Sequence, residues 1–380
     1  MMIPKIRAAI IGCGVISDIY FNNITRRLAC LELAACCDLN AEAARRLSDK
    51  YNVPYMTMEE LLSDQSIKLV INLTPPMAHA QVIRDALMAG KHVYTEKPLA
   101  ATVEQAREVC ALTDEKKLML CAAPDTFLGA AGQTARWALD SGMIGKVTSC
   151  AALLNRDGGW MAEKYPFTAF PGGGIGTDVG IYYVTMMLSL LGPVTEVCGM
   201  WDTVRPQRKH YSLARREWGE TYELKSENLV SAVFRFANGC QGVMHLNANS
   251  IQNEQPHLIL YGTEGMLYLP DPNRFGGEVR VLLKGQQTPF VLPMTHGFAD
   301  NSRGLGVADM AWALRKGRKP RADKALALHG LELLLGAKQS AADKCFYQMK
   351  STFERPAPLP RGYLDESYSN ANPENGLAVE

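Results

Sequence analysis

Residues 90–101 read GKHVYTEKPLAA, and this stretch decides how the chain around it is expected to fold. The apolar, β-branched part, His92–Thr95, predicts a short buried strand that follows a helix. Pro98 cannot donate a hydrogen bond to a neighbouring strand, so the strand is expected to stop where Glu96 and Lys97 emerge. Because open α/β sheets hold ligands at the carboxyl ends of their strands, this pair is expected at a ligand-binding edge. An isolated Glu-Lys-Pro is more often a surface turn, so the interpretation depends on its surroundings.

A glycine-rich turn opens the first half of the chain. The apolar run Ile6–Ile11 predicts a strand buried on both faces, and a helical stretch begins at Asp18. Between them lies GCGVIS, a dinucleotide fingerprint with serine in place of the third glycine. Gly12 would permit the tight turn, and Gly14 would let a pyrophosphate approach the backbone at the helix N-terminus. The same turn supplies two further cofactor-contact candidates, Val15 and Ile16.

An acidic residue, Asp38, follows the second predicted strand, Leu33–Cys37. Its distance from the glycine turn is typical of the carboxylate that hydrogen-bonds the adenosine ribose. Since this carboxylate would repel a 2′-phosphate, the sequence predicts NAD, with NADP less favoured. Arg45 and Arg46 on the next helix could soften that preference. The alternative for Asp38 is a turn or helix-capping role.

Strand and helix patterns then alternate as far as residue 122. Further strands are expected at 54–56, 68–73 and 118–122, and helices at 41–50, 58–62, 79–89 and 103–112. This alternation predicts βαβ units in a doubly wound parallel sheet. Thr74 and Pro75 end one of these strands, where a cofactor would cross the sheet. His79 is a further cofactor-contact candidate, although a plain role in the first helical turn is the simpler interpretation.

Length and composition exclude several classes of protein. A chain of 380 residues favours two domains, and 47% hydrophobic with 21% charged residues is typical of a soluble globular protein. A net charge of +1 argues against nucleic acid or an anionic membrane as the main partner. No apolar run reaches membrane-spanning length, and the N-terminus lacks the features of a signal peptide. The 10 cysteines show no metal-ligand spacing, so a cytoplasmic protein without a metal is expected.

Taken together, GCGVIS, Asp38, TPPMAHA, GKHVYTEKPLA and the later GGGIGTDVG resemble the Gfo/Idh/MocA family, which includes glucose–fructose oxidoreductase and inositol dehydrogenase. The resemblance runs from about Ile6 to about Ser340. It implies an N-terminal Rossmann domain and a C-terminal α+β domain with a large, mostly antiparallel open sheet. The expected boundaries are 1–123 for the NAD-binding domain, 124–355 for the substrate-binding domain and 356–380 for a C-terminal arm. A homodimer or homotetramer through the C-terminal sheet is also implied.

The resemblance further implies reversible oxidation of a sugar or cyclitol hydroxyl by NAD(P). Glu96 and Lys97 would lie at the nicotinamide, with Lys97 bonded to the reacting hydroxyl. Burial and the cationic ring could lower the pKa of Lys97 to roughly 7–8, so that it accepts the proton. Asp178 would orient the sugar. The family usually has His at position 182, whereas this chain has Tyr182, which matches a branch with a Tyr-Tyr pair and suits a hydrogen-bonding or relay role.

The region 156–170 is rich in glycine and aromatic residues. Aromatic faces beside polar groups suit a pyranose ring, and a packed loop is an equal alternative. Asp125 stands where many family members carry Arg. The substrate-contact candidates are therefore Asp125, Arg156, Trp160, Tyr165 and Tyr183. Arg303 and His329 are weaker candidates, for which a structural role is favoured, and the strands from 194 to 269 predict an antiparallel meander.

Three functions remain open from the sequence. The first is an NAD-dependent dehydrogenase acting on a secondary hydroxyl of a sugar, a sugar derivative or a glycoside. The second is a glycosidase that oxidises C3 transiently, eliminates the aglycone, adds water and re-reduces the sugar. The third is a non-catalytic regulator that senses NAD and sugar. Retention of Lys97 and Asp178 argues against the regulator.

Overall fold

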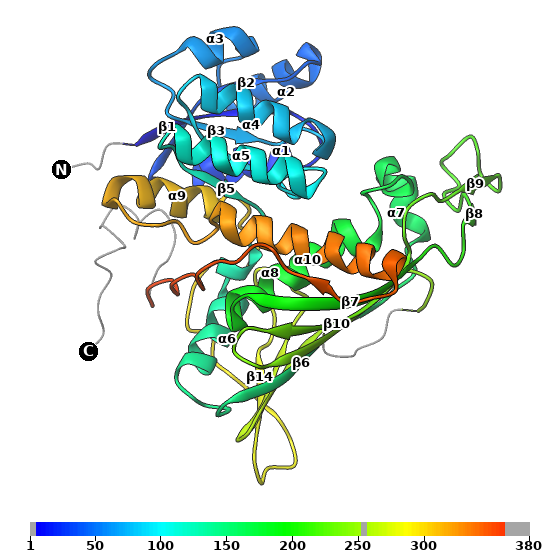
Figure 1. Cartoon of the computed structure of the whole chain (residues 1–380). Coiled ribbons are helices and arrows are strands. Elements are labelled where there is room, and N and C mark those ends of the chain that lie inside the picture. The colour runs from blue at the N-terminus through cyan, green and yellow to red at the C-terminus, as the bar shows by residue number, and fades with distance from the viewer. Residues whose placement is uncertain (1–4, 252–256, 362–380) are drawn as a thin grey trace.

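The computed structural model describes residues 5–251 and 257–361. Its N-terminal half is a parallel sheet in the order β2-β1-β3-β4-β5, with helices on both faces (Figure 1). Alternate side chains of β1 enter different hydrophobic clusters, with Ala8 and Ile10 in one and Ala9 and Ile11 in the other. The predicted doubly wound sheet is confirmed. Its strands are β1 (Ile6–Ile11), β2 (Leu31–Cys37), β3 (Leu69–Asn72), β4 (His92–Thr95) and β5 (Leu120–Ala122), and its helices are α1 (Ser17–Arg26), α2 (Ala41–Tyr51), α3 (Met58–Ser63), α4 (His79–Met88) and α5 (Val103–Glu115).

The strand expected at 54–56 is reduced to a single parallel bridge between Tyr55 and Cys36 at the outer edge of β2. The amide of Cys36 donates to the Pro54 carbonyl at 2.9 Å, and the Met56 amide donates back to the Cys36 carbonyl at 3.0 Å. Pro54 has no N–H with which to extend the ladder. With this bridge counted as an edge strand, the strand order is that of a Rossmann fold.

The C-terminal half is built on a second sheet, in the order β15-β14-β13-β12-β6-β11-β10-β7-β16. Its neighbouring strands are antiparallel except for β6 and β11, which run parallel. The mostly antiparallel sheet is therefore confirmed, but a simple meander is wrong, because β6 lies between two strands that follow it in sequence. The strands are β6 (Val147–Asn155), β7 (Val194–Asp202), β10 (Leu229–Phe236), β11 (Gln241–Asn247), β12 (Leu258–Gly262), β13 (Gly265–Leu269), β14 (Arg280–Leu283), β15 (Phe290–Val291) and β16 (Tyr347–Gln348).

Helices cover one face of this sheet (Figure 1). Along β10, Val230, Ala232 and Phe234 are buried, whereas Val233 and Arg235 between them are exposed, so the opposite face is open. The helices of this half are α6 (Ala130–Asp140), α7 (Gly159–Lys164), α8 (Gly180–Leu191), α9 (Leu305–Lys316) and α10 (Lys324–Asp343). A separate hairpin, β8 (Gln207–Lys209) and β9 (Thr221–Glu223), stands beside α7.

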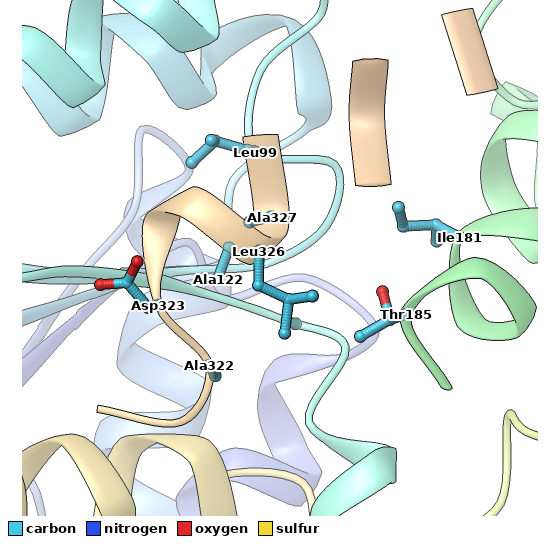
Figure 2. Close-up of a pocket in the computed structure, with 9 residues that line it drawn as sticks. Leu99, Ala122, Ile181, Thr185, Ala322, Asp323, Leu326 and Ala327 are labelled. Carbon is cyan, nitrogen blue, oxygen red and sulfur yellow. The ribbon is translucent and has the colours of Figure 1, made fainter. Parts of the chain in front are cut away.

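Segments from late in the sequence join the two halves. The Ala122 amide of β5 donates to the Ala322 carbonyl at 3.1 Å, and α10 contacts both α5 and α8. Figure 2 shows the resulting junction, where Leu326 of α10 faces α8 across a cavity of about 10 Å³. This space holds about one water molecule, so it is not a substrate pocket.

The C-terminal segment is tied to the body as far as Arg361. The Leu359 amide donates to Gln133 Oε1 at 2.7 Å, and Arg136 Nη1 donates to the Pro356 carbonyl at 2.8 Å. The rest of the expected arm, 362–380, lies outside the described residues. None of the described helices is long and apolar enough to cross a membrane.

Candidate active site

The glycine turn between β1 and α1 has the geometry that a dinucleotide requires. Gly12 has φ of +103°, and a Cβ there would lie 2.6 Å from the backbone of Leu73 at the end of β3. A Cβ on Gly14, in contrast, would meet no atom within 4 Å, so the backbone is open on that side. Val15 is exposed and Ile16 partly exposed. The turn is therefore tight against the sheet and accessible from outside, as a pyrophosphate site must be.

Asp38 lies directly beside this turn. One carboxylate oxygen accepts from the Cys13 amide at 2.6 Å, and the other accepts from the Asn40 amide at 2.7 Å. Asn40, not Asp38, caps α2, since its side chain accepts from Glu42 and Ala43. These two contacts fix the Asp38 carboxylate beside the glycine turn.

Apolar side chains are exposed around the same edge, which the sequence alone did not single out. Leu39 after β2 and Met77 after β3 are among the most exposed large hydrophobic residues. Together with Val15 they surround the carboxyl ends of parallel strands, where flat aromatic rings of a cofactor would pack. The residues present therefore fit a bound NAD.

His79 joins the two loops that follow β3 and β4. It is fully buried, with Nδ1 2.6 Å from the Pro98 carbonyl and Nε2 2.8 Å from the Thr74 carbonyl. Burial lowers the pKa of this imidazole. Thr74 is held in turn by Asn72 Oδ1, at 2.7 Å from its hydroxyl. Pro75 begins the short 3₁₀ turn Pro76–Ala78 that leads into α4. His79 therefore links the loop that follows β3 to the loop that follows β4.

Lys97 and Asp178 meet from opposite halves of the molecule. The Lys97 ammonium forms an ion pair with the Asp178 carboxylate and also donates to the Asp178 carbonyl at 2.9 Å. Burial alone lowers the pKa of Lys97, but the Asp178 carboxylate, Tyr182 and Glu96 outweigh it, so the pKa is raised. The lowered pKa expected from the sequence rested on burial and a bound cationic nicotinamide, and it left out the carboxylate partner that raises the pKa here.

Asp178 is presented by a π-helical turn, Ile175–Val179, that precedes α8. Glu227 holds this turn, accepting from the Thr177 amide at 2.9 Å and from its hydroxyl at 2.8 Å. A Cβ on Gly174 would lie 2.3 Å from the Glu227 carboxyl carbon, so only glycine fits. Such π turns are often found at functional sites, and here the turn aims Asp178 at Lys97.

Tyr182 lies beneath the ion pair on the first turn of α8. The Lys97 ammonium lies 5.2 Å from the centre of the Tyr182 ring. Arg303 approaches from the loop before α9, with Nη2 3.5 Å from the tyrosine oxygen and 2.8 Å from Asn273 Oδ1. Burial raises the pKa of Tyr182, although Lys97 and Arg303 act in the opposite direction. The phenol is therefore protonated at neutral pH.

Glu96 is held by a residue that sequence reasoning missed. The Tyr20 hydroxyl of α1 donates to Glu96 Oε1 at 2.8 Å, and the Lys97 amide donates to Oε2 at 3.0 Å. Tyr20 lies in the helix that follows the glycine turn, so this bond couples the two cofactor-facing loops. An isolated tyrosine in a helix gives no signal of such a contact in the sequence.

Two predicted substrate contacts lie elsewhere. Asp125 is buried, and its Oδ2 accepts from the amides of Gly304 at 3.0 Å and Gly306 at 2.9 Å. Tyr183 is also fully buried, with its hydroxyl 2.7 Å from His257 Nδ1. Adjacent residues of a helix point in different directions, so Tyr182 reaches the ion pair and Tyr183 does not. Both residues are placed by the structure in supporting positions.

The remaining substrate-contact candidates also lie in different parts of the structure. Arg156 and Trp160 line a cavity of about 730 Å³ at the end of β6, whereas Tyr165 is not part of its wall. Residues that the sequence did not indicate, Tyr211 and Asn249, complete this wall from the β8–β9 hairpin and the end of β11. His329 is buried in α10, where its Nε2 accepts from the Val194 amide at 2.9 Å, a structural role. No group of three potential metal ligands occurs in residues 5–251 and 257–361.

Two family models match the chain. Residues 6–123 match "Oxidoreductase family, NAD-binding Rossmann fold", and residues 133–268 match the C-terminal domain of the same Gfo/Idh/MocA family. Together the two models cover more than half of the sequence.

Curated relatives match over shorter segments. An uncharacterized oxidoreductase of Schizosaccharomyces pombe is 29% identical over 212 residues, 53% of this chain and 56% of that protein. A levoglucosan dehydrogenase of Pseudarthrobacter phenanthrenivorans is 26% identical over 244 residues, 60% of this chain and 62% of that protein. The chain thus matches little more than half the length of these relatives.

Solved structures share the whole fold. A levoglucosan dehydrogenase in complex with NADH and L-sorbose superposes with a TM-score of 0.78 at 19% identity, covering 92% of this chain and all of that one. An oxidoreductase from Agrobacterium radiobacter in complex with NAD⁺, L-tartaric acid and magnesium superposes with a TM-score of 0.76 at 18% identity. The match covers 91% of this chain and 98% of that one. At such identities the likeness concerns the fold. With both halves of the architecture and both family models in agreement, the chain belongs to the Gfo/Idh/MocA family of oxidoreductases.

Proposed function

We propose that this protein is an NAD-dependent dehydrogenase that oxidises a secondary hydroxyl of a sugar, a sugar derivative or a glycoside. The observation that carries the proposal is the ion pair of Lys97 and Asp178 at the ligand-binding edge of the Rossmann sheet. The open glycine turn and the carboxylate of Asp38 lie at the same edge. Relatives named levoglucosan dehydrogenase and inositol 2-dehydrogenase support a polyhydroxylated substrate.

The cofactor's contribution, when NAD is bound, is to accept hydride at the nicotinamide. Gly12, Gly14, Val15 and Ile16 would hold its pyrophosphate, with Thr74 and Pro75 beside it. Asp38 would accept from the ribose hydroxyls and disfavour a 2′-phosphate, so NAD is preferred over NADP. Glu96, fixed by Tyr20, would lie next to the nicotinamide.

The proton is handled by Lys97. In this structure Lys97 is an ammonium because Asp178 stabilises its charge. A substrate hydroxyl that donates to Asp178 replaces Lys97 at that carboxylate, and burial then favours the neutral amine. Lys97 can in this way accept the proton of the reacting hydroxyl as hydride leaves the carbon, while Asp178 orients the neighbouring hydroxyl. Tyr182 contributes a hydrogen bond or a relay.

A Lys97→Ala variant tests this function. The protein should reduce NAD⁺ with at least one member of a panel of polyols, sugars and glycosides, measured by NADH absorbance. Lys97→Ala should abolish this turnover while NADH affinity, measured by fluorescence titration, stays within a few-fold of wild type. The exposed Lys146→Ala is the matched control and should retain full activity. Equal loss of turnover and NADH affinity would contradict the role of Lys97.

The glycosidase alternative needs a base for the C2 proton, and the Tyr182 hydroxyl would have to serve as that base. Its raised pKa does not favour that role. Incubation with an aryl glycoside separates the two functions, because a dehydrogenase gives net NADH. Release of the aglycone without net NADH would establish the glycosidase instead, and NAD binding without any turnover would favour the regulator.

We further propose that the protein forms a homodimer or homotetramer through the open face of the C-terminal sheet. Val233 and Val243 lie directly opposite each other on β10 and β11 and are nearly half exposed, with Met200 of β7 nearby. Val233→Lys should shift the mass measured by light scattering towards the monomer. Leu213→Lys, an exposed site on the β8–β9 hairpin, should leave the mass unchanged. A monomeric wild type at micromolar concentration would contradict this assembly.

A further inference from the structure

The cavity at the end of β6 is larger than one monosaccharide needs. At about 730 Å³ it falls within the size range of small-molecule binding sites. It lies where β6 and β11 end, between α7 and the β8–β9 hairpin. Its wall consists of Arg156, Asp157, Trp160, Arg205, Tyr211, Asn249, Ser250 and Ile251.

Positive charge dominates this wall. Arg156 and Arg205 line the cavity together with a single carboxylate, Asp157, one oxygen of which accepts from the Gly159 amide at 2.9 Å. Nε of Arg156 is buried without a hydrogen-bond partner among the described residues. Neither arginine forms an ion pair with any of the described carboxylates. The cavity thus offers two guanidinium groups and one carboxylate, and neither guanidinium is paired with a described carboxylate.

A third arginine, Arg208, lies directly behind the wall. It is only 4% exposed, and its Nη2 donates to the side chain of Asn249, a lining residue. Its Nε and Nη1 have no partner within residues 5–251 and 257–361. Buried guanidinium groups are normally fully hydrogen-bonded, so unpaired donors next to a cavity indicate a missing acceptor. Carboxylate and phosphate are the acceptors that match guanidinium geometry.

Aromatic rings complete the wall. Trp160 of α7 and Tyr211 of the hairpin line the cavity and remain about half exposed. Half-exposed rings beside polar groups provide the flat surface on which the C–H face of a sugar ring packs. A free inorganic anion would make no use of these rings.

The cavity wall is linked to the turn that carries Asp178 through the neighbouring residues Glu227 and Asn228. Asn249 Nδ2 donates to the backbone carbonyl of Asn228 at 3.0 Å. The preceding residue, Glu227, holds the turn of Asp178 through Thr177. The wall of the cavity and the catalytic turn are therefore parts of one hydrogen-bonded structure.

We propose that this cavity binds the acidic group of the substrate, so that the protein acts on a sugar derivative or glycoside that carries a carboxylate or a phosphate away from the reacting hydroxyl. This inference rests on the proposed dehydrogenase function. Arg156 and Arg205 pair with the anion, Arg208 adds positive potential from behind, and Trp160 and Tyr211 pack on the ring.

Calorimetric titration of the NADH-loaded protein tests the inference without turnover. The probes are two matched pairs, methyl glucuronide against methyl glucoside and glucose 6-phosphate against glucose. One acidic member should bind at least tenfold more tightly than its neutral counterpart, and the pair that shows this identifies carboxylate or phosphate as the preferred group. Arg205→Gln should reduce that ratio to about threefold or less, since a charged hydrogen bond contributes roughly a tenfold effect or more. Arg216→Gln, an exposed arginine outside the cavity wall, should keep the ratio.

Asp157→Asn provides a test in the opposite direction, because it removes the negative charge of the wall and should tighten binding of the acid. Equal binding of acidic and neutral probes, or a ratio unchanged in Arg205→Gln, would overturn the inference. Acid binding without NAD⁺ reduction by any panel member would mean that the proposed function fails while the anion site stands.

Discussion

At the scale of single residues, the protonation state of Lys97 is decided by two opposing influences. Burial disfavours the ammonium, and the Asp178 carboxylate, in direct contact, favours it more strongly. A proton acceptor must lose its proton first, so in the free protein the amine forms only at alkaline pH. The oxidation rate should accordingly rise with pH across the neutral range.

Asp178→Asn should move this rise to lower pH. With the carboxylate replaced by a neutral amide of similar shape, burial becomes the larger influence and the pKa of Lys97 falls. The measurement is kcat/KM against pH for both proteins with the same substrate. Weaker substrate binding by the Asp178→Asn variant would lower the whole curve without moving its midpoint. A midpoint that stays in place or rises would show that Asp178 does not control Lys97.

At the scale of elements, the π turn before α8 determines where Asp178 points. Three glycines of GGGIG, at positions 173, 174 and 176, lie against neighbouring segments, and a Cβ on Gly174 would lie 2.4 Å from the Glu227 carbonyl oxygen. Backbone atoms cannot rotate away as the end of a flexible side chain can. The turn therefore depends on glycine at this position.

Gly174→Ala should displace the turn and separate Asp178 from Lys97. We expect kcat/KM for the sugar to fall at least tenfold, while NADH affinity stays within a few-fold because the glycine turn at Gly12 is remote from α8. Steady-state kinetics and NADH fluorescence titration measure the two effects. If NADH affinity fell as much as kcat/KM, the substitution would have disturbed the whole fold and not only the turn.

Some of these elements and site residues can be predicted from the sequence, and others cannot. The Rossmann strands, the glycine turn and Asp38 were predictable from local periodicity and motif spacing, whereas Lys97 and Asp178 were singled out by the resemblance to the family. The pairing of β6 with β11 was not, because strand order depends on packing between distant segments. Tyr20, Tyr211 and Arg205 carry no local signal, so their places at the site emerged only from the tertiary structure. The upward shift of the pKa of Lys97 likewise depended on a partner 81 residues away.

At the scale of the whole molecule, the loop before α9 fastens the C-terminal half to the Rossmann sheet. Gly304 packs against Leu28 and Tyr20 of the first half, and its amide, with that of Gly306, donates to Asp125 at the end of β5. Both bonds end on one carboxylate oxygen. Burial raises the pKa of Asp125 to about 6, although these amides and Arg303 act in the opposite direction. Ionisation of Asp125 therefore destabilises the folded protein at neutral pH.

Asp125→Asn should remove this destabilisation. Because the pKa is higher in the folded protein than in the unfolded chain, wild-type stability from this group is greatest below the unfolded value of 3.8 and declines as pH rises to about 6. The loss amounts to about 3 kcal/mol at pH 7. An amide oxygen can accept both glycine amides without a charge, so the Asp125→Asn variant should have a higher denaturation midpoint than wild type at pH 7 and match it near pH 4. Denaturant unfolding at both pH values measures this difference. Substrate preference should be unchanged, since Asp125 faces the loop before α9. An altered preference would show that Asp125 influences substrate binding.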